Sequence, residues 1–242
     1  MAAEYGIIGY PLGHTFSPAY FNKKFAEENI DAVYTAYPIK DIQHLPVLCK
    51  DHRDLQGLSV TIPYKQAVVP YMDSLDITAE RTGAVNCIHL HNGLKIGYNT
   101  DADGFEKSMQ PLLRPYHDRA LILGTGGAAQ AVQYVLAKLG IGYTQVSRGK
   151  EGMMSYEEIT DDVIRAHPLI INTTPLGTFP QVDECPDIPY SALTDAHLLY
   201  DLIYNPAETK FLSLGKAQGA AIKNGYEMLL LQAEAAWQIW NS

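Results

Sequence analysis

The 242-residue chain is long enough for one large α/β domain or two smaller ones, and its 47% hydrophobic and 19% charged residues are typical of a folded globular protein. The 18 basic and 27 acidic residues give a net charge of −9, which argues against general binding to nucleic acid or to an anionic membrane surface. No apolar run is as long as a membrane span, and the first residues lack the basic start of an export signal, so we expect a cytoplasmic protein.

The first hundred residues alternate short apolar strands with amphipathic helices. A Ser-Pro pair at 17–18 is typical of an N-cap and a first helical position, and it predicts a helix to about residue 29. Pro63 opens a second predicted helix, which runs through Val69. Asn92-Gly93 is the strongest short signal for a β-hairpin. The predicted strands of this half of the chain are 5–8, 32–37, 57–62, 84–90 and 94–98.

From about Asp101 the pattern changes to buried strands that alternate with helices, which is typical of a doubly wound, Rossmann-type domain. Ala120–Leu123 is a short apolar strand, a glycine-rich segment follows at once, and an amphipathic helix ends at Gly140. The stretch 226–240 is an apolar helix, which we expect to pack back against the first domain. The other predicted strands are 143–146, 169–171 and 198–203.

The segment Gly124-x-Gly126-x-x-Ala129 matches the G-x-G-x-x-G/A pattern of dinucleotide-binding proteins. Gly124 permits the tight turn from strand to helix, Gly126 lets the backbone approach a pyrophosphate, and Ala129 allows the helix to pack closely on the strand. The N–H groups of the helix N-terminus would then bind the anion. A plain turn between strand and helix is the alternative, which the preceding strand and the following amphipathic helix disfavour.

The end of the second strand of this domain distinguishes NADP from NAD. An NAD-binding unit usually has an acid about 20 residues after the glycine loop, where it holds the ribose 2′-hydroxyl. This chain has Ser147-Arg148-Gly149-Lys150 there. Arg148 and Lys150 would neutralise a 2′-phosphate and Ser147 would donate a hydrogen bond to it, so NADP is favoured over NAD. A solvated basic turn is the alternative.

Polar residues in four segments of the first domain are hard to explain by structure alone. Lys65 is expected in the first turn of a helix, whose positive end disfavours a cation and so makes the ammonium a better proton donor; a solvent-exposed lysine is the alternative. Asn86 interrupts an apolar run, which a structural hydrogen bond would also explain. Thr61 ends an apolar strand, and Asn99-Thr100-Asp101 either caps the next helix or contributes to a site.

These segments occur together, in this order, in one family. The chain resembles the shikimate dehydrogenases throughout its length, and motifs from both halves agree in order and spacing. The resemblance implies NADPH-dependent reduction of 3-dehydroshikimate to shikimate, in the pathway to aromatic amino acids. The matching motifs are Gly9-Tyr10-Pro11-Leu12-Gly13-His14-Thr15-Phe16-Ser17-Pro18, Val60-Thr61-Ile62-Pro63-Tyr64-Lys65, Gly83-Ala84-Val85-Asn86, Asn99-Thr100-Asp101, the glycine loop, Asn172-Thr173-Thr174-Pro175-Leu176-Gly177 and Asn224-Gly225…Gln232.

The resemblance also implies roles for individual residues. The Lys–Asp pair that handles the proton in this family falls on Lys65 and Asp101. Thr15 stands where the family has a serine, and Gly149 stands where it usually has a threonine, which leaves strict use of NADP in doubt. The substrate-binding positions fall on Thr15, Ser17, Thr61, Asn86, Tyr204 and Gln232. The cofactor-binding positions fall on Gly124, Gly126, Gly127, Ala128, Ser147, Arg148, Lys150, Thr173 and Gly225.

We therefore expect two α/β domains with a cleft between them: a substrate-binding domain of residues 1–101 plus 225–242, and an NADP-binding Rossmann-type domain of residues 102–224. The expected ligands are NADP and 3-dehydroshikimate or shikimate, without metal, nucleic acid or membrane, and the chain would act as a monomer or homodimer. The three cysteines have no metal-binding spacing and are expected to be reduced thiols. Two alternatives stay open: a relative that uses quinate or NAD, and a non-catalytic NADP-sensing protein of the same fold.

Overall fold

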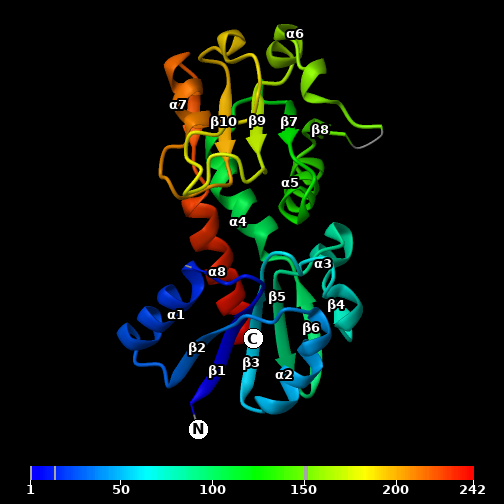
Figure 1. Cartoon of the computed structure of the whole chain (residues 1–242), viewed down its shortest axis with the longest axis vertical. Helices are drawn as coiled ribbons and strands as arrows, with labels where there is room; N and C mark the ends of the chain where they lie inside the picture. The colour runs from blue at the N-terminus through cyan, green and yellow to red at the C-terminus, as the bar shows by residue number, and fades with distance from the viewer. Residues whose placement is uncertain (1, 14, 150–151) are drawn as a thin grey trace. The chain divides into compact units, whose positions relative to one another are not determined.

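The computed structural model describes residues 2–13, 15–149 and 152–242, and it divides into two compact units (Figure 1). The first unit runs to Thr100 and includes Ala233–Ser242, and the second is Asp101–Gln232. Residues 225–232, which we expected in the first domain, therefore lie in the second unit. The reason is packing, because Met228 is buried in the core of the second unit together with Phe105.

The first unit is built on a six-stranded sheet with the strand order β2-β1-β3-β5-β6-β4. β1 pairs in parallel with β2 and β3, β5 runs antiparallel to β3 and β6, and β4 pairs in parallel with β6. The elements of this unit are β1 (Ala3–Ile8), α1 (Phe16–Glu27), β2 (Ala32–Tyr37), α2 (Leu45–Asp51), β3 (Leu55–Val60), β4 (Ser74–Leu75), α3 (Ile77–Thr82), β5 (Cys87–His91) and β6 (Leu94–Tyr98). Short 3₁₀ turns occur at Ile42–His44 and Val69–Tyr71.

Two hydrophobic clusters make up the core of the first unit. In one cluster Phe21 of α1 packs with Tyr5 of β1 and with Trp240, at the end of α8 (Tyr226–Trp240). The ring centroids of Phe21 and Trp240 are 5.4 Å apart, and the Trp240 indole donates a hydrogen bond to the carbonyl of Ile88. In the other cluster Leu45 of α2 packs with residues of β3 and β5. The last turns of α8 thus pack in the first unit, as the apolar sequence predicted.

The β5–β6 hairpin confirms the prediction made from Asn92-Gly93. Both turn residues have positive φ, 52° for Asn92 and 79° for Gly93, as a type I′ turn requires. His91 pairs with Leu94 across the turn, so the two-residue loop fixes the register of the hairpin.

The helix predicted from Pro63 to Val69 does not form. Residues 62–68 form irregular turns that lead into the 3₁₀ turn at Val69–Tyr71. The Lys65 carbonyl accepts the N–H of Val85 at 2.7 Å instead of a helical N–H, and Pro70 has no N–H with which to continue a helix. Lys65 therefore lies in a turn and not in the first turn of a helix, so its ammonium is not at the helix end that we expected.

The second unit is built on a five-stranded parallel sheet with the order β11-β10-β9-β7-β8 (Figure 1). Because β7 lies between β8 and β9, the chain reverses direction across the sheet there, at the place where open α/β sheets bind ligands. Its elements are α4 (Thr100–Met109), β7 (Arg119–Leu123), α5 (Gly127–Lys138), β8 (Gly142–Val146), α6 (Asp161–Arg165), β9 (Leu169–Asn172), β10 (Leu198–Asp201), α7 (Lys210–Ala217), β11 (Ala221–Lys223) and the first turns of α8. The 3₁₀ turns are Gln110–Leu112, Tyr156–Glu158 and Tyr190–Ala192.

The core of the second unit also consists of two clusters. Phe105 of α4, Val132 of α5 and Met228 of α8 pack in one of them, and Phe211 of α7 and Ile164 of α6 pack in the other. The sheet therefore has helices on both faces, as a doubly wound domain requires. α5 ends before a glycine at 140 with φ of 71°, the left-handed cap that the sequence predicted.

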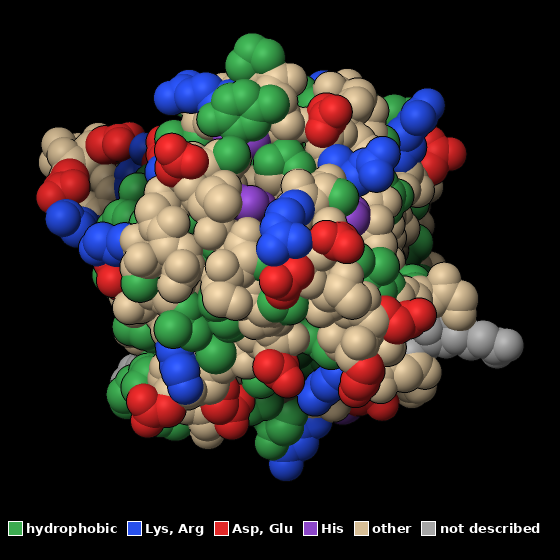
Figure 2. Space-filling model, turned by 90° about the horizontal axis from the view of Figure 1, so that it is seen from above, with side chains coloured by type: hydrophobic (Ala, Val, Ile, Leu, Met, Phe, Trp, Pro, Cys, Tyr) green, Lys and Arg blue, Asp and Glu red, His purple; other side chains and the backbone are tan. Residues whose placement is uncertain are grey.

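Charged side chains are mixed on the surface seen in Figure 2, where basic and acidic groups alternate over that face. No helix among the residues that the structure describes is both long and apolar enough to span a membrane.

Because His117 of the second unit is buried, we expect the stability of the protein to be sensitive to acid. His117 accepts the N–H of Arg114 through Nδ1, and burial lowers the pKa of its imidazole. A pKa below the value of about 6.5 in the unfolded chain means that stability is lost as pH falls through that value, since the unfolded state binds the proton more readily. We expect the free energy of unfolding to decrease from pH 7.5 to pH 5.5, measured by urea denaturation, and to decrease less in His117→Gln.

Candidate active site

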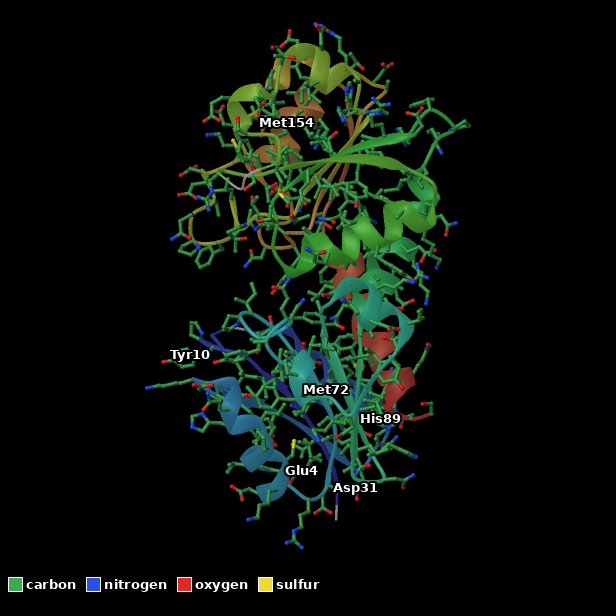
Figure 3. The ribbon with its side chains drawn as sticks, turned by 90° about the vertical axis from the view of Figure 1, so that its right-hand side faces the viewer. Glu4, Tyr10, Asp31, Met72, His89 and Met154 are labelled. Carbon is green, nitrogen blue, oxygen red and sulfur yellow. The ribbon has the colours of Figure 1, made fainter. Side chains whose placement is uncertain are left out.

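Two of the predicted substrate residues of the first unit, Thr61 and Asn86, lie at the end of its sheet where β1 and β3 end and β5 begins. The N–H of Thr61, directly after β3, donates to the carbonyl of Ile8 at 3.0 Å. The N–H of Val60 donates to the carbonyl of Asn86 at 2.7 Å. Tyr10 lies at the same edge through its N–H bond to Ile62, and its side chain projects outward from the unit (Figure 3). Strand pairing thus brings together segments as far apart in the sequence as Ile8 and Asn86, which are 78 residues apart.

Asn86 is held by Thr100, the first residue of α4. Its Oδ1 accepts the Thr100 N–H at 2.7 Å and its Nδ2 donates to the Thr100 hydroxyl at 2.9 Å, and both residues are buried. The structural hydrogen bond that the sequence left open as an explanation of Asn86 is therefore present. It fixes the backbone immediately before Asp101, so Asn86 also orders the start of α4.

Lys65 is half-buried, in the turn that follows this edge. The Lys65 carbonyl accepts the N–H of Val85 at 2.7 Å. Together with the bond from the Val60 N–H to the Asn86 carbonyl, it joins residues 60–65 to residues 85–86 by backbone hydrogen bonds before and after Thr61. The turn orders the backbone of the lysine while its long side chain remains partly exposed to solvent.

The start of α1 differs from the prediction by two residues. The helix begins at Phe16, so Thr15 and not Ser17 occupies the N-cap position, and the Thr15 side chain makes no capping hydrogen bond. Ser17 is buried within the first turn and hydrogen-bonds to Tyr34, whose hydroxyl donates to Ser59 at 2.7 Å. Burial raises the pKa of Tyr34, so its phenol stays protonated and remains a donor.

Replacing Ser17 by alanine separates its structural and binding roles. We expect a loss of about 1 kcal/mol in the free energy of unfolding, because a buried hydrogen bond is removed. If Ser17 also binds a substrate carboxylate, its loss should raise the KM for substrate about tenfold. Tyr34→Phe is the matched control, since it removes the partner hydroxyl and should lower stability without changing KM. An unchanged KM in Ser17→Ala would leave only the structural role.

Asp101 and Gln232 lie on two helices of the second unit that pack closely. Asp101 is buried in the first turn of α4, where the helix dipole favours an acid. One turn later, a Cβ on Gly104 would lie 3.1 Å from the Cβ of Gln232, so glycine lets α4 approach α8. The Gln232 side chain donates to the carbonyl of Leu229 at 2.9 Å.

The glycine loop turns directly from β7 into α5. Gly124 has φ of 113°, a conformation that other residues rarely adopt, and a Cβ there would lie 2.6 Å from the Thr173 hydroxyl. Thr173 in turn donates through N–H and hydroxyl to the carbonyl of Leu123, at 2.9 and 2.7 Å. Gln145 of β8 donates to the Gly124 carbonyl at 2.9 Å, so the neighbouring strands on both sides hold the loop in place.

Gly126 is the N-cap of α5, and Gly127 and Ala128 are its first residues. Gly126 has an ordinary φ of −76°, and a Cβ there would meet nothing within 4 Å in the described chain. Internal packing therefore gives no reason for glycine at this position. The open space lies beside the N–H groups that begin the helix, which is the arrangement that a dinucleotide pyrophosphate requires.

The basic turn follows β8, at the same edge of the sheet. The N–H of Ser147 donates to the carbonyl of Met154 at 2.9 Å, and Arg148 is exposed, close enough to Tyr156 to affect its electrostatics. Met154 is labelled in the second unit in Figure 3. Lys150, also expected to bind cofactor, lies outside the described residues.

Tyr204 and Gly225 come together in the segments that follow β10 and β11. Tyr204 is 37% exposed. The N–H of Gly225 donates to the carbonyl of Ile203 at 3.0 Å, and a Cβ on Gly225 would overlap the carbonyl of Leu202. Close packing against Leu202 therefore explains glycine at position 225, whether or not a cofactor lies beside it.

Polar residues without a role expected from the sequence also shape this end of the sheet. Gln145 supports the glycine loop, and Asp201 and Asn172 form a fully buried pair at the ends of β10 and β9. A signal for the pair was present, because an acid and an amide each end an otherwise apolar strand.

A parallel sheet with a glycine loop at its carboxyl edge defines the second unit as a dinucleotide-binding α/β domain of the kind found in oxidoreductases. Residues 7–88 match the model of the shikimate dehydrogenase substrate-binding domain. The shikimate dehydrogenase (NADP(+)) of Carboxydothermus hydrogenoformans is 38% identical, and the match covers 97% of this chain and 90% of that protein.

Solved structures agree with this match. The shikimate dehydrogenase of Aquifex aeolicus has a TM-score of 0.88 at 34% identity, covering 99% of this chain and 92% of that one. The shikimate 5-dehydrogenase of Listeria monocytogenes, solved with shikimate and NAD, has a TM-score of 0.89 at 26% identity, also covering 99% and 92%. The chain belongs to the shikimate dehydrogenase family.

Proposed function

We propose that this protein catalyses the reversible reduction of 3-dehydroshikimate to shikimate with NADPH, in the cytoplasm. The glycine loop carries the proposal, because Gly126 leaves space that internal packing does not use, beside the first N–H groups of α5. The family relatives that match nearly the whole chain support the substrate. Bound there, the reduced nicotinamide would supply the hydride.

The protein must supply the proton that the reduced carbonyl oxygen accepts. Hydride addition places negative charge on the carbonyl oxygen, and a lysine ammonium can neutralise that charge and donate the proton. We assign this role to Lys65, and to Asp101 the orientation of the ammonium and of the product hydroxyl. General acid catalysis of this kind accelerates a reaction by about 10²–10⁴-fold.

The remaining residues orient the substrate. We assign its carboxylate to Thr15 and Ser17 at the start of α1, with Tyr204, and its hydroxyl groups to Thr61, Asn86 and Gln232. Thr15 suits this role because its hydroxyl makes no capping bond to the helix. Asn86 has both amide groups engaged with Thr100, so it would present a preorganised surface to the substrate.

We assign the 2′-phosphate of NADP to Ser147, Arg148 and Lys150. The exposed guanidinium of Arg148 suits this role, because a planar donor pair matches a phosphate. NAD is the second candidate cofactor, since the Listeria monocytogenes relative was solved with NAD.

The test is a panel of two cofactors and two acids. Absorbance of reduced nicotinamide is followed with NADPH or NADH and 3-dehydroshikimate, and in reverse with shikimate or quinate. We expect turnover with NADPH and shikimate-type substrates. Preference for NADH or quinate would favour the related dehydrogenase, and tight NADPH binding without turnover would favour a sensor.

A further inference from the structure

A buried carboxylate outside the residues assigned above lies at the end of β10. Asp201, Asn172 and Thr209 are all fully buried. The hydroxyl of Thr209 donates to Asp201 Oδ2 at 2.6 Å, and Oδ1 accepts the Ile203 N–H and the Asn172 amide, each at 3.1 Å. A carboxylate can only accept, so three converging donors on one side chain form a well-satisfied network.

The network continues into the loop after β9. Asn172 uses its amide nitrogen for Asp201 and its Oδ1 for Thr174, accepting the Thr174 N–H at 3.0 Å and the hydroxyl at 2.6 Å. Thr173 lies between these two residues and bonds to the carbonyl that precedes Gly124. Through Asn172, the Asp201 carboxylate therefore fixes the conformation of the loop that holds Thr173 against the glycine turn.

The same carboxylate sets the loop after β10. Ile203, whose N–H it accepts, directly precedes Tyr204, and the Ile203 carbonyl accepts the N–H of Gly225. Thr209 connects it to the N-terminus of α7, where the same hydroxyl accepts the Leu212 N–H. Asp201 is thus connected by hydrogen bonds to the ends of β9 and β10 directly, and to the segment after β11 through Ile203 and Gly225.

We propose that Asp201 is a positioning residue for the cofactor and substrate ligands, which fixes the loops that carry Thr173 and Tyr204 by accepting hydrogen bonds from Asn172 at the end of β9, from Ile203 after β10 and from Thr209 just before α7. This inference rests on the proposed function, because it concerns the ligands assigned to those loops. Asp201 touches no reacting atom and acts through the loop backbone.

Burial and hydrogen bonding act in opposite directions on this group. Burial raises the pKa of Asp201 to about 6, while its bonds to Thr209, Ile203 and Asn172 lower it. At pH 7 and above the carboxylate is therefore ionised, the form that accepts from all three donors. Asparagine at this position would replace one carboxylate oxygen by an NH₂ group, so one of the three donors would face another donor instead of an acceptor.

Asp201→Asn and Thr209→Val test the positioning role. Asp201→Asn removes an acceptor and Thr209→Val removes a donor, each with little change of shape. We expect the Kd for NADPH, measured by titration calorimetry, to rise about 10- to 100-fold and kcat/KM to fall by a similar factor, because small displacements of binding groups have large effects on binding and rate. Thr209→Ser keeps the hydroxyl and should restore wild-type values. Ile164→Ala, in the α6 cluster outside the network, controls for lost stability and should leave the Kd unchanged.

The outcomes separate this inference from the proposed function. Wild-type Kd and kcat/KM in both Asp201→Asn and Thr209→Val would overturn the positioning role alone, as would an equal loss in Ile164→Ala. A wild-type chain that neither binds NADPH nor turns over substrate would overturn the proposed function and the inference with it. If Asp201→Asn does not fold, Thr209→Val against Thr209→Ser still decides the question.

Discussion

Replacement of Lys65 by alanine should lower kcat about 10²–10⁴-fold, while KM for 3-dehydroshikimate changes much less. The reason is that the ammonium is proposed to act on charge that develops only as hydride is added, so the ground-state complex loses little. Lys65 is half-buried beside the edge that carries Thr61 and Asn86, where strand pairing and the Val85 hydrogen bond order its backbone. Steady-state kinetics with NADPH measure both constants.

Two further variants make the Lys65 experiment specific. Lys23→Ala, on the exposed part of α1, removes the same charge away from this edge and should leave kcat unchanged. Lys65→Arg keeps the charge but replaces a compact ammonium by a planar group, so only part of the rate should return. Near-normal turnover in Lys65→Ala would remove this residue from the mechanism.

Elements whose signals are local could be predicted from the sequence. Asn92-Gly93 forms the hairpin because both residues tolerate positive φ, which depends on no distant contact. The buried strand Ala120–Leu123 and the glycine cap at Gly140 are equally local, and they place the glycine loop correctly. For residues such as Gln232, which no local pattern indicates, the expected role came only from the resemblance to the family and stays a prediction.

The partners in tertiary hydrogen bonds could not be predicted from the sequence. The turn at Lys65 replaces a helix because its carbonyl bonds to Val85, 20 residues further on. Asp201 and Asn172 are 29 residues apart in sequence, and each satisfies the other only after β9 and β10 have paired. The start of α1 at Phe16 differs from the prediction by two residues because both Thr15 and Ser17 are good cap residues, and the fold buries the second against Tyr34.

A second large effect is expected in the glycine loop, where two added methyl groups should act in different ways. Gly124→Ala places a Cβ 2.6 Å from the Thr173 hydroxyl on a backbone with φ of 113°. We expect the free energy of unfolding to fall by about 1–3 kcal/mol, since such a conformation is strained for alanine. Urea denaturation without ligand measures this loss.

Gly126→Ala should lower the free energy of unfolding without ligand by no more than about 1 kcal/mol, because its φ of −76° suits alanine and its Cβ meets nothing within 4 Å in the described chain, while alanine is a weaker N-cap than glycine. The added methyl instead occupies space that the pyrophosphate needs beside the start of α5, so the Kd for NADPH should rise about 10- to 100-fold. Titration of NADPH into both variants measures the effect on binding. If Gly126→Ala bound NADPH as tightly as the wild type, the loop would be an ordinary turn between strand and helix, and the dinucleotide would have to bind elsewhere.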